Sequence, residues 1–481
     1  MSGKMRRVLL AGVAISALGI CCAFFYTAPP GTAREDKTGV DPFANSTIAL
    51  PPNYKGPKFE LSHNYPATLP NPPLPTPWKI TLGGKPISKA TAGAYCEALK
   101  KAVSADMQVL IADSANWDAA KRGWYNQPWL QSIREPIHGM FTANDTPASQ
   151  FTHPSPDKSV VMINDWAAVY YNATAAVTLG RFWGPTAMKP TLTTEAGQFA
   201  EGSLIVKLAY TQVSGAEWSV MKDAPEWTLY AQMQNEKGEQ SGPVKYFPTY
   251  LLQLDIIVKD TQAAPKTGWV YTTLVFDNTV KGDFWARMVP LGAMWGNDPD
   301  VNSAMNPDAP LNETWINPQA PAYSKDTLGW GGRLSGPNDG AVASAGTYID
   351  PKTGTWGTVN QANSSCMSCH SPAEWKFESF LLPGGIKDFN GNPAYYMAAP
   401  GSPEWMKWFQ DRSGTEPMDK GTIALDYDMM FAFKALEKWS ISVQTAVPNK
   451  SQFLRPLELR RQMGKSMEFD YRGFPKKINK E

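Results

Sequence analysis

Residues 250–259 read Tyr-Leu-Leu-Gln-Leu-Asp-Ile-Ile-Val-Lys, and aliphatic and polar side chains alternate over 252–256. As a strand, this stretch places four aliphatic side chains on one face, Leu252, Leu254, Ile256 and Val258, and Gln253, Asp255 and Lys259 on the other. Three further β-prone runs, 202–210, 226–233 and 268–276, are separated from it by turns rich in Gly, Asn, Lys and Pro. Together these runs predict an antiparallel β-sheet.

Helical periodicity appears in the sequence before and after the predicted strands. Apolar residues recur at helical spacing through 95–103, and Ser88 is suited to cap the start of that helix. A second helical face repeats through 429–443. Residues 278–363 are rich in Gly, Pro, Asn and Trp and show little periodicity, which predicts long ordered loops. We therefore expect an α+β fold with an antiparallel sheet, peripheral helices and long Gly/Pro/Trp-rich loops.

Composition excludes several classes of protein. The 481 residues include 45 Lys and Arg against 44 Asp and Glu, a formal net charge of +1. Because so small a charge offers no footprint for a polyanion, no nucleic-acid partner is expected. The hydrophobic fraction of 43% excludes a disordered or collagen-like chain.

The amino terminus has the pattern of an export signal. Lys4, Arg6 and Arg7 precede a charge-free run over 8–26, and small residues and prolines follow. We expect residues 1–33 to be a signal peptide and the protein to be periplasmic or otherwise exported. An uncleaved membrane anchor is the alternative, and a membrane partner is expected only in that case.

Three further regions follow the leader. Residues 34–77 form a Pro-rich arm that is either a strap over the folded body or a spacer, because repeated prolines remove backbone donors. Residues 78–375 are predicted to be a β-rich body. Residues 376–481 are predicted to be a mainly helical extension.

The chemistry is concentrated in Cys366-Met367-Ser368-Cys369-His370. Two thiols three residues apart, followed directly by a histidine, suit thioether bonds to a haem and an imidazole ligand to its iron. We therefore predict one covalent haem c held by Cys366 and Cys369, with His370 as the metal ligand. A thioredoxin-like redox pair, half of a zinc site and a structural disulfide are the alternatives. Cys96, on the predicted helix, is expected to be a small buried hydrophobe.

The sixth coordination position of the iron, opposite His370, distinguishes an electron carrier from a catalyst. A sixth protein ligand favours electron transfer, whereas an open position permits a small molecule to bind. Met397 and Met418 are candidate sixth ligands, and His138 is a candidate distal group, although ordinary packing is the alternative for each. Arg333 is a candidate partner for a haem propionate, with a solvated loop arginine as the alternative.

Two segments outside the haem motif contribute to a family resemblance. Residues 167–176 and 199–207, taken together with the motif, resemble the cytochrome P-460 and cytochrome c-prime-beta family. The resemblance implies a periplasmic monohaem protein whose β-sheet forms a haem-binding core, with His370 as the proximal ligand. It also implies that Lys207 contacts the porphyrin or is crosslinked to it. An edge-strand lysine that blocks association between sheets is the alternative for Lys207.

The chain is far longer than a typical member of that family. The resemblance implies oxidation of hydroxylamine or nitric oxide, or binding of a gas. We therefore expect a haem protein that binds, and oxidises or reduces, a small nitrogen or oxygen ligand. An electron carrier that works with a redox partner protein is the alternative function, and a haem-free secreted binding module with a disulfide is a third.

Overall fold

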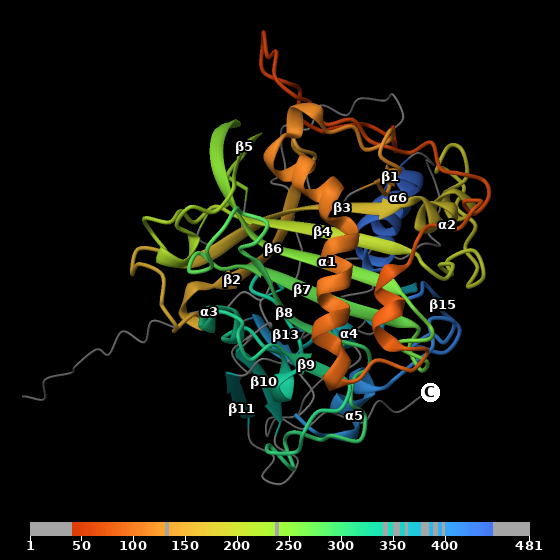
Figure 1. Cartoon of the computed structure of the whole chain (residues 1–481), viewed down its shortest axis with the longest axis vertical. Coiled ribbons are helices and arrows are strands. Elements are labelled where there is room, and N and C mark those ends of the chain that lie inside the picture. Colours follow the sequence, from red (N-terminus) through yellow and green to blue (C-terminus); the bar gives the residue numbers. More distant parts are fainter. Residues whose placement is uncertain are drawn as a thin grey trace, which may run out of the picture.

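The computed structural model describes residues 41–129, 134–235, 240–339, 345–349, 356–360, 364–376, 384–387, 393–396 and 400–445. Within these residues, nine strands form an antiparallel sheet in which β1, β3, β4, β6, β7, β8 and β9 are successive neighbours (Figure 1). β2 also pairs with β3, and β5 with β6. The strands are β1 Trp124–Tyr125, β2 Phe141–Pro147, β3 Met162–Asn172, β4 Leu204–Thr211, β5 Glu226–Ala231, β6 Lys245–Lys259, β7 Trp269–Phe276, β8 Met288–Met294 and β9 Thr314–Ile316. The predicted antiparallel sheet and α+β class are confirmed.

Strand β6 is central and follows the predicted alternation except at one residue. Leu254, Ile256 and Val258 lie on one face, as expected. Leu252 does not, because Ala209 of β4 pairs with Gln253 while Tyr210 pairs with Leu251, which leaves Leu252 as the extra residue of a β-bulge. The placement of Leu252 with the other three was therefore wrong: it packs in a separate cluster with Phe151.

Helix α1, Lys89–Ala112, lies across one face of the sheet (Figure 1). Its first turn is closed by a capping box between Ser88 and Thr91, which confirms the predicted start. One stripe of the helix is buried against the sheet, comprising Tyr95, Cys96, Leu99, Val103 and Met107. Cys96 is a fully buried core residue, as its position on the helix predicted.

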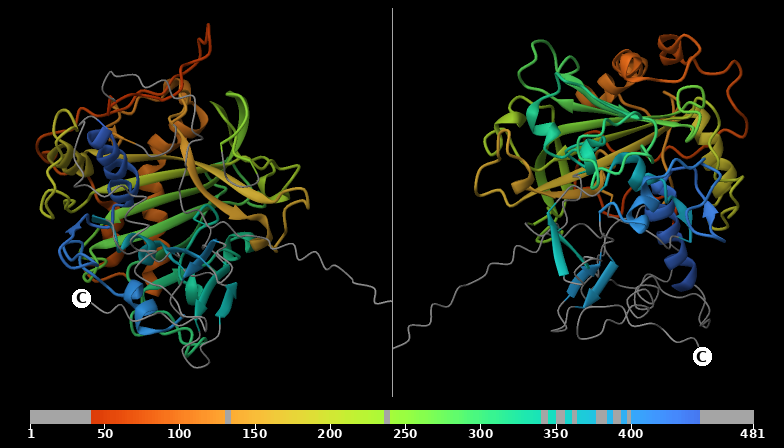
Figure 2. Two further views of the ribbon diagram at one scale, coloured as in Figure 1. Left: turned by 180° about the vertical axis from the view of Figure 1, so that it is seen from behind. Right: turned by 90° about the horizontal axis from the view of Figure 1, so that it is seen from below.

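The opposite face is covered by segments from distant parts of the sequence (Figure 2). They are α2 Ala173–Trp183, the short helix α4 Cys366–His370, a π-helix Met430–Ala435 and α6 Leu436–Thr445. The helix predicted near the C-terminus is thus present as a π-helical turn continued by an α-helix. Two short strands, β12 Glu374–Trp375 and β15 Ile423–Ala424, join the segment after α4 to the segment before the π-helix.

The expectation of loops throughout 278–363 was wrong. This region contains β8 and β9 of the main sheet, and β10 Ala345–Ile349 and β11 Trp356–Asn360 of a four-stranded sheet completed by β13 Gly384–Lys387 and β14 Pro393–Tyr396. β8 is apolar on both faces and contains Pro290 and Gly292, so it has neither the alternation nor the composition of an exposed strand. Gly292 is required there, since a Cβ would lie 2.4 Å from the carbonyl oxygen of Trp315 in β9.

The described part of the Pro-rich arm, from residue 41, packs against the body as a strap. The backbone N–H of Phe59 donates to the carbonyl of Pro136, and that of Asn126 donates to the carbonyl of Ser62. Phe59 is buried. The predicted leader, residues 1–33, lies outside the described residues, and none of the helices that are described combines the length and apolarity needed to span a bilayer.

Candidate haem-attachment site

The predicted haem motif forms helix α4. Ser365 caps it: the Ser365 hydroxyl accepts a hydrogen bond from the Ser368 N–H, and the Ser368 hydroxyl accepts one from the Ser365 N–H. The backbone N–H of Cys366 donates to the carbonyl oxygen of Leu334. This bond anchors α4 to the loop that follows residues 330–332. Cys366 and Cys369 are half-buried residues with free thiols, and the structure contains no disulfide between them.

His370, the last residue of α4, is held in one orientation by its Nδ1 atom. Nδ1 lies 2.8 Å from the carbonyl oxygen of Tyr427, so it carries the proton and donates. The hydroxyl of Tyr271 donates to the same carbonyl at 3.2 Å, and the Tyr271 ring lies 4.9 Å from the imidazole, centroid to centroid. Burial lowers the pKa of His370 to about 4, so the ring is neutral at physiological pH and Nε2 bears a lone pair.

A strained turn presents the Tyr427 carbonyl to this histidine. Asp426 and Tyr427 both have positive φ angles, of 47° and 67°, which cost non-glycine residues about 1–3 kcal/mol each. The turn is held by the buried Asp426 carboxylate, which accepts hydrogen bonds from Lys259 at 2.6 Å and from the Trp269 indole at 2.8 Å. Sheet residues thus fix the backbone atom that orients His370.

Lys207 projects from the sheet face that α4 covers. The predicted alternation along β4 is confirmed, because Leu204, Val206 and Leu208 pack on the α1 side and Ile205 packs on the α4 side. The edge-strand alternative for Lys207 is wrong, since β4 lies between β3 and β6 inside the sheet. Its ammonium group lies 2.6 Å from Asp339 and 3.6 Å from Asp255.

The two carboxylates share further partners. The amide of Gln253 donates to Asp255 and to Asp339 at 2.9 Å, and the hydroxyl of Thr273 donates to Asp255 at 2.8 Å. Gly336 permits this arrangement, since a Cβ there would lie 2.2 Å from Gln253 Oε1. The sheet and the loop before α4 therefore enclose the half-buried Lys207 cation between the buried Asp255 and the half-buried Asp339.

Burial and neighbouring charges set the protonation states of this group. Burial lowers the pKa of Lys207, but Asp339 and Asp255 outweigh that effect and raise it above its ordinary value. Burial, and then the charge of Asp339, raise the pKa of Asp255 to about 6. Burial also acts to raise the pKa of Asp339, yet its contact with Lys207 outweighs burial and lowers it. Lys207 is therefore an ammonium ion, and bond formation to a porphyrin carbon requires that it first lose this proton.

The two thiols lack the electrostatic environment of a reactive redox pair. Burial, followed by the charges of Asp339 and Asp255, raises the pKa of Cys366 well above its ordinary value. Burial and Asp339 raise the pKa of Cys369 to about 12. Because redox-active Cys-X-X-Cys pairs depend on a lowered thiol pKa, the thioredoxin-like alternative is disfavoured.

Arg333 lies on a loop near α4 but has no donor to spare. Its five N–H groups donate to five acceptors of the chain: the carbonyls of Asn297, Asp298, Val301 and Trp330, and the Ser303 hydroxyl. The guanidinium also lies 4.9 Å from the Trp330 ring and 5.0 Å from the Phe409 ring. Arg333 therefore holds loops together, and nothing in its bonding is available to a haem propionate.

His138, the candidate distal group, lies on the other side of the sheet. Its ring stacks on Trp227 at 4.3 Å with an interplanar angle of 5°, and Trp227 packs in the α1 cluster. Burial lowers the pKa of His138 to about 4. Met418 is buried, and Met397 lies outside the described residues. The sheet separates His138 from His370.

Replacing His138 by Phe is expected to weaken the pH dependence of stability between pH 4 and 6.5. A histidine whose folded pKa is lowered binds its proton first in the unfolded state, so stability falls as pH falls through this window. In the wild-type protein, His138 accounts for a fall of about 2–3 kcal/mol in the free energy of unfolding over this window. Phe retains the stack on Trp227 but has no titrating group. Urea unfolding of the wild-type chain and the variant at several pH values measures this pH dependence. An unchanged pH dependence would contradict the lowered pKa of His138.

Sequence reasoning missed most partners of the motif. Asp255 and Gln253 were recognised as the polar face of a strand but not as a buried pair, and Asp339 and Tyr427 carried no local signal. Among the described residues, no three His, Cys, Asp or Glu side chains are grouped to hold a metal ion. Comparison with family models, curated proteins and solved structures gives no match.

Proposed function

We propose that this chain is an exported monohaem c-type cytochrome that binds, and oxidises or reduces, a small nitrogen or oxygen compound. The observation that carries the proposal is the hydrogen bond from His370 Nδ1 to the Tyr427 carbonyl within a Cys-X-X-Cys-His helix. Histidines that ligate a metal commonly donate their other N–H to a carbonyl or carboxylate, which fixes the tautomer and the ring plane.

The residues of the site suit a covalently attached haem. Cys366 and Cys369 are unpaired and partly exposed, and they stand one turn apart on the helix that ends with His370. Bound haem would supply redox chemistry and a coordination position on its iron. His370 would ligate the iron through Nε2, Tyr427 and Tyr271 would keep the ring oriented, and Lys207 with its carboxylates would place ionisable groups beside the cofactor.

Asp255 gives the proposed site a candidate proton acceptor. Its pKa of about 6 places the change of charge near physiological pH, and Thr273 and Gln253 hold its carboxylate in a fixed position. Oxidation of a compound such as hydroxylamine releases protons as well as electrons, so a fixed base beside the haem suits that class of reaction.

The test is spectroscopic. The full chain is matured in a host with haem-ligation machinery, and its absorption spectrum is recorded in both oxidation states, with and without nitric oxide and carbon monoxide. High-spin iron that binds either gas supports the proposal. Six-coordinate low-spin iron in both states would replace it with an electron-transfer cytochrome. A colourless protein would indicate a haem-free binding module.

A further inference from the structure

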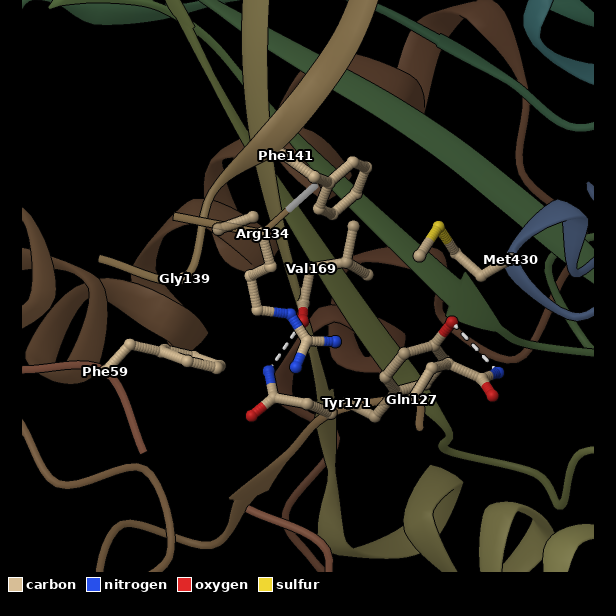
Figure 3. A pocket seen from close by; sticks show the side chains of 10 residues that line it. Phe59, Gln127, Arg134, Gly139, Phe141, Val169, Tyr171 and Met430 are labelled. Atoms are coloured by element: carbon tan, nitrogen blue, oxygen red, sulfur yellow. Dashed lines mark hydrogen bonds between the residues drawn. The ribbon is translucent and has the colours of Figure 1, made fainter. Parts of the chain in front are cut away.

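A small cavity lies beneath the strap, near the C-terminal end of β3. Figure 3 shows the guanidinium of Arg134 in the middle of the lining side chains, between Phe59 on one side and Tyr171 with Gln127 on the other. The hollow contains about 280 Å³ of empty space when the part open to solvent is counted, and its enclosed part admits a body about the size of one water molecule.

Arg134 is buried but only partly bonded. Its side chain donates to the carbonyl of Ala44 at 3.1 Å and to that of Pro128 at 3.2 Å, and it lies over the ring of Phe59 at 5.3 Å. The residue is 6% exposed. A guanidinium has five N–H groups, so three of them have no acceptor among the described residues.

The charge of Arg134 also has no carboxylate partner in the described part of the chain. Burial lowers its pKa to about 10, opposed by Tyr65 and Tyr170 and by no acidic residue. The neighbouring Glu135 instead accepts the backbone N–H groups of Ile137, His138 and Met140. Arg134 is still charged at neutral pH, and an unpaired buried charge is costly.

Gln127 lines the same space, and its amide is bonded to other residues of the chain. The Gln127 amide nitrogen lies 3.4 Å from the Tyr171 hydroxyl and 3.5 Å from Asp428, which are long hydrogen bonds. Its oxygen accepts a hydrogen bond from the Trp183 indole at 2.6 Å, so the Gln127 amide is bonded to the chain at both ends. Most of the remaining wall is apolar, with Phe141, Val169 and Met430. The Asn126 amide also lines it, but it is already bonded to the Val169 carbonyl and the Ser62 N–H.

We propose that this cavity binds one halide ion, chloride under physiological conditions, against the Arg134 guanidinium. A monatomic anion matches the size of the enclosed space, whereas phosphate or sulfate does not. The apolar wall also favours a weakly hydrated anion over a multiply charged one. The ion would neutralise Arg134, and none of the lining residues belongs to α4, so this proposal does not require a bound haem.

Thermal unfolding of the full chain tests the proposal. Sodium chloride replaces sodium gluconate at constant ionic strength, so that general screening does not change. Over a hundredfold rise in chloride above the dissociation constant, the Tm is expected to increase by about 3 °C. Arg134→Gln should abolish this chloride-specific increase. Arg122→Gln should retain it, since Arg122 also lies over an aromatic ring, that of Trp117, but is paired with Asp106 outside the cavity.

A second measurement uses the wild-type chain, so it does not depend on whether a variant folds. Crystals of the wild-type chain grown in sodium bromide should show an anomalous scattering peak beside the Arg134 guanidinium. Equal Tm values in the two salts, or a water with no bromide peak at this position, would overturn the proposal.

Discussion

Replacing both Cys366 and Cys369 by Ala is expected to reduce the haem content of the denatured protein from one per chain to none. The thioether bonds are the only attachment that survives denaturation in the proposed site, so removal of both sulfurs leaves nothing to retain the porphyrin. Mass spectrometry of the denatured full chain measures the effect directly. The wild-type chain should show the added mass of one haem.

The matched control is Cys96→Ala. Cys96 is a buried thiol on α1, on the opposite side of the sheet, and its sulfur lies 3.8 Å from the carbonyl oxygen of Gly292. This variant should carry a full complement of haem. Attached haem in the Cys366→Ala/Cys369→Ala variant, or none in the wild type after maturation in a competent host, would refute the proposed cofactor.

Replacing Lys207 by Met is expected to destabilise the fold by about 3–5 kcal/mol at neutral pH. The substitution removes the cation that lies between Asp255 and Asp339, and a buried charge left without its partner costs about that much. Urea unfolding of the full chain measures the loss. Since the same variant cannot form a lysine crosslink, its absorption spectrum also tests whether wild-type Lys207 is crosslinked to the proposed haem.

The loss should shrink as the pH is lowered from 7 to 5. Without the ammonium group, the pKa values of both carboxyl groups rise in the folded state, so protonation near pH 5 removes the repulsion between them. An equal loss at both pH values would show that the effect comes from packing and not from charge.

Lys121→Met is the control for burial. Lys121 contacts Asp118 at 3.0 Å, and 85% and 44% of the two side chains are exposed. Removal of an exposed ion pair typically costs less than about 1 kcal/mol. A similar loss for Lys121→Met and Lys207→Met would contradict the argument from burial.

Local sequence predicted the elements whose signals are periodic. The start of α1 followed from Ser88 and the helical spacing after it, and β6 followed from its alternation. The bulge at Leu252 was not foreseen, because it depends on how β6 pairs with β4 and not on the residues of β6 alone. β8 was missed because a strand buried on both faces loses the alternation that identifies strands.

The candidate site divides in the same way. The spacing of two cysteines and a histidine over 366–370 is a local property, so the sequence alone supports the prediction of haem attachment. The carbonyl of Tyr427 and the carboxylate of Asp339 reach the site only through the folded chain. The roles predicted for Arg333 and His138 depended on neighbours that sequence does not specify, and the fold gives both residues other partners.

The strand and helix periods, the near-neutral charge and the chemistry available at residues 366–370 are all readable from the amino-acid order alone. Tertiary structure decided which side chains surround that chemistry: Lys207 between two aspartates, His370 against Tyr427, and Arg134 in a cavity with no acidic partner among the described residues. The physical reason is that periodicity arises between residues a few positions apart. Burial and charge pairing arise instead between residues that the fold brings together from distant parts of the chain.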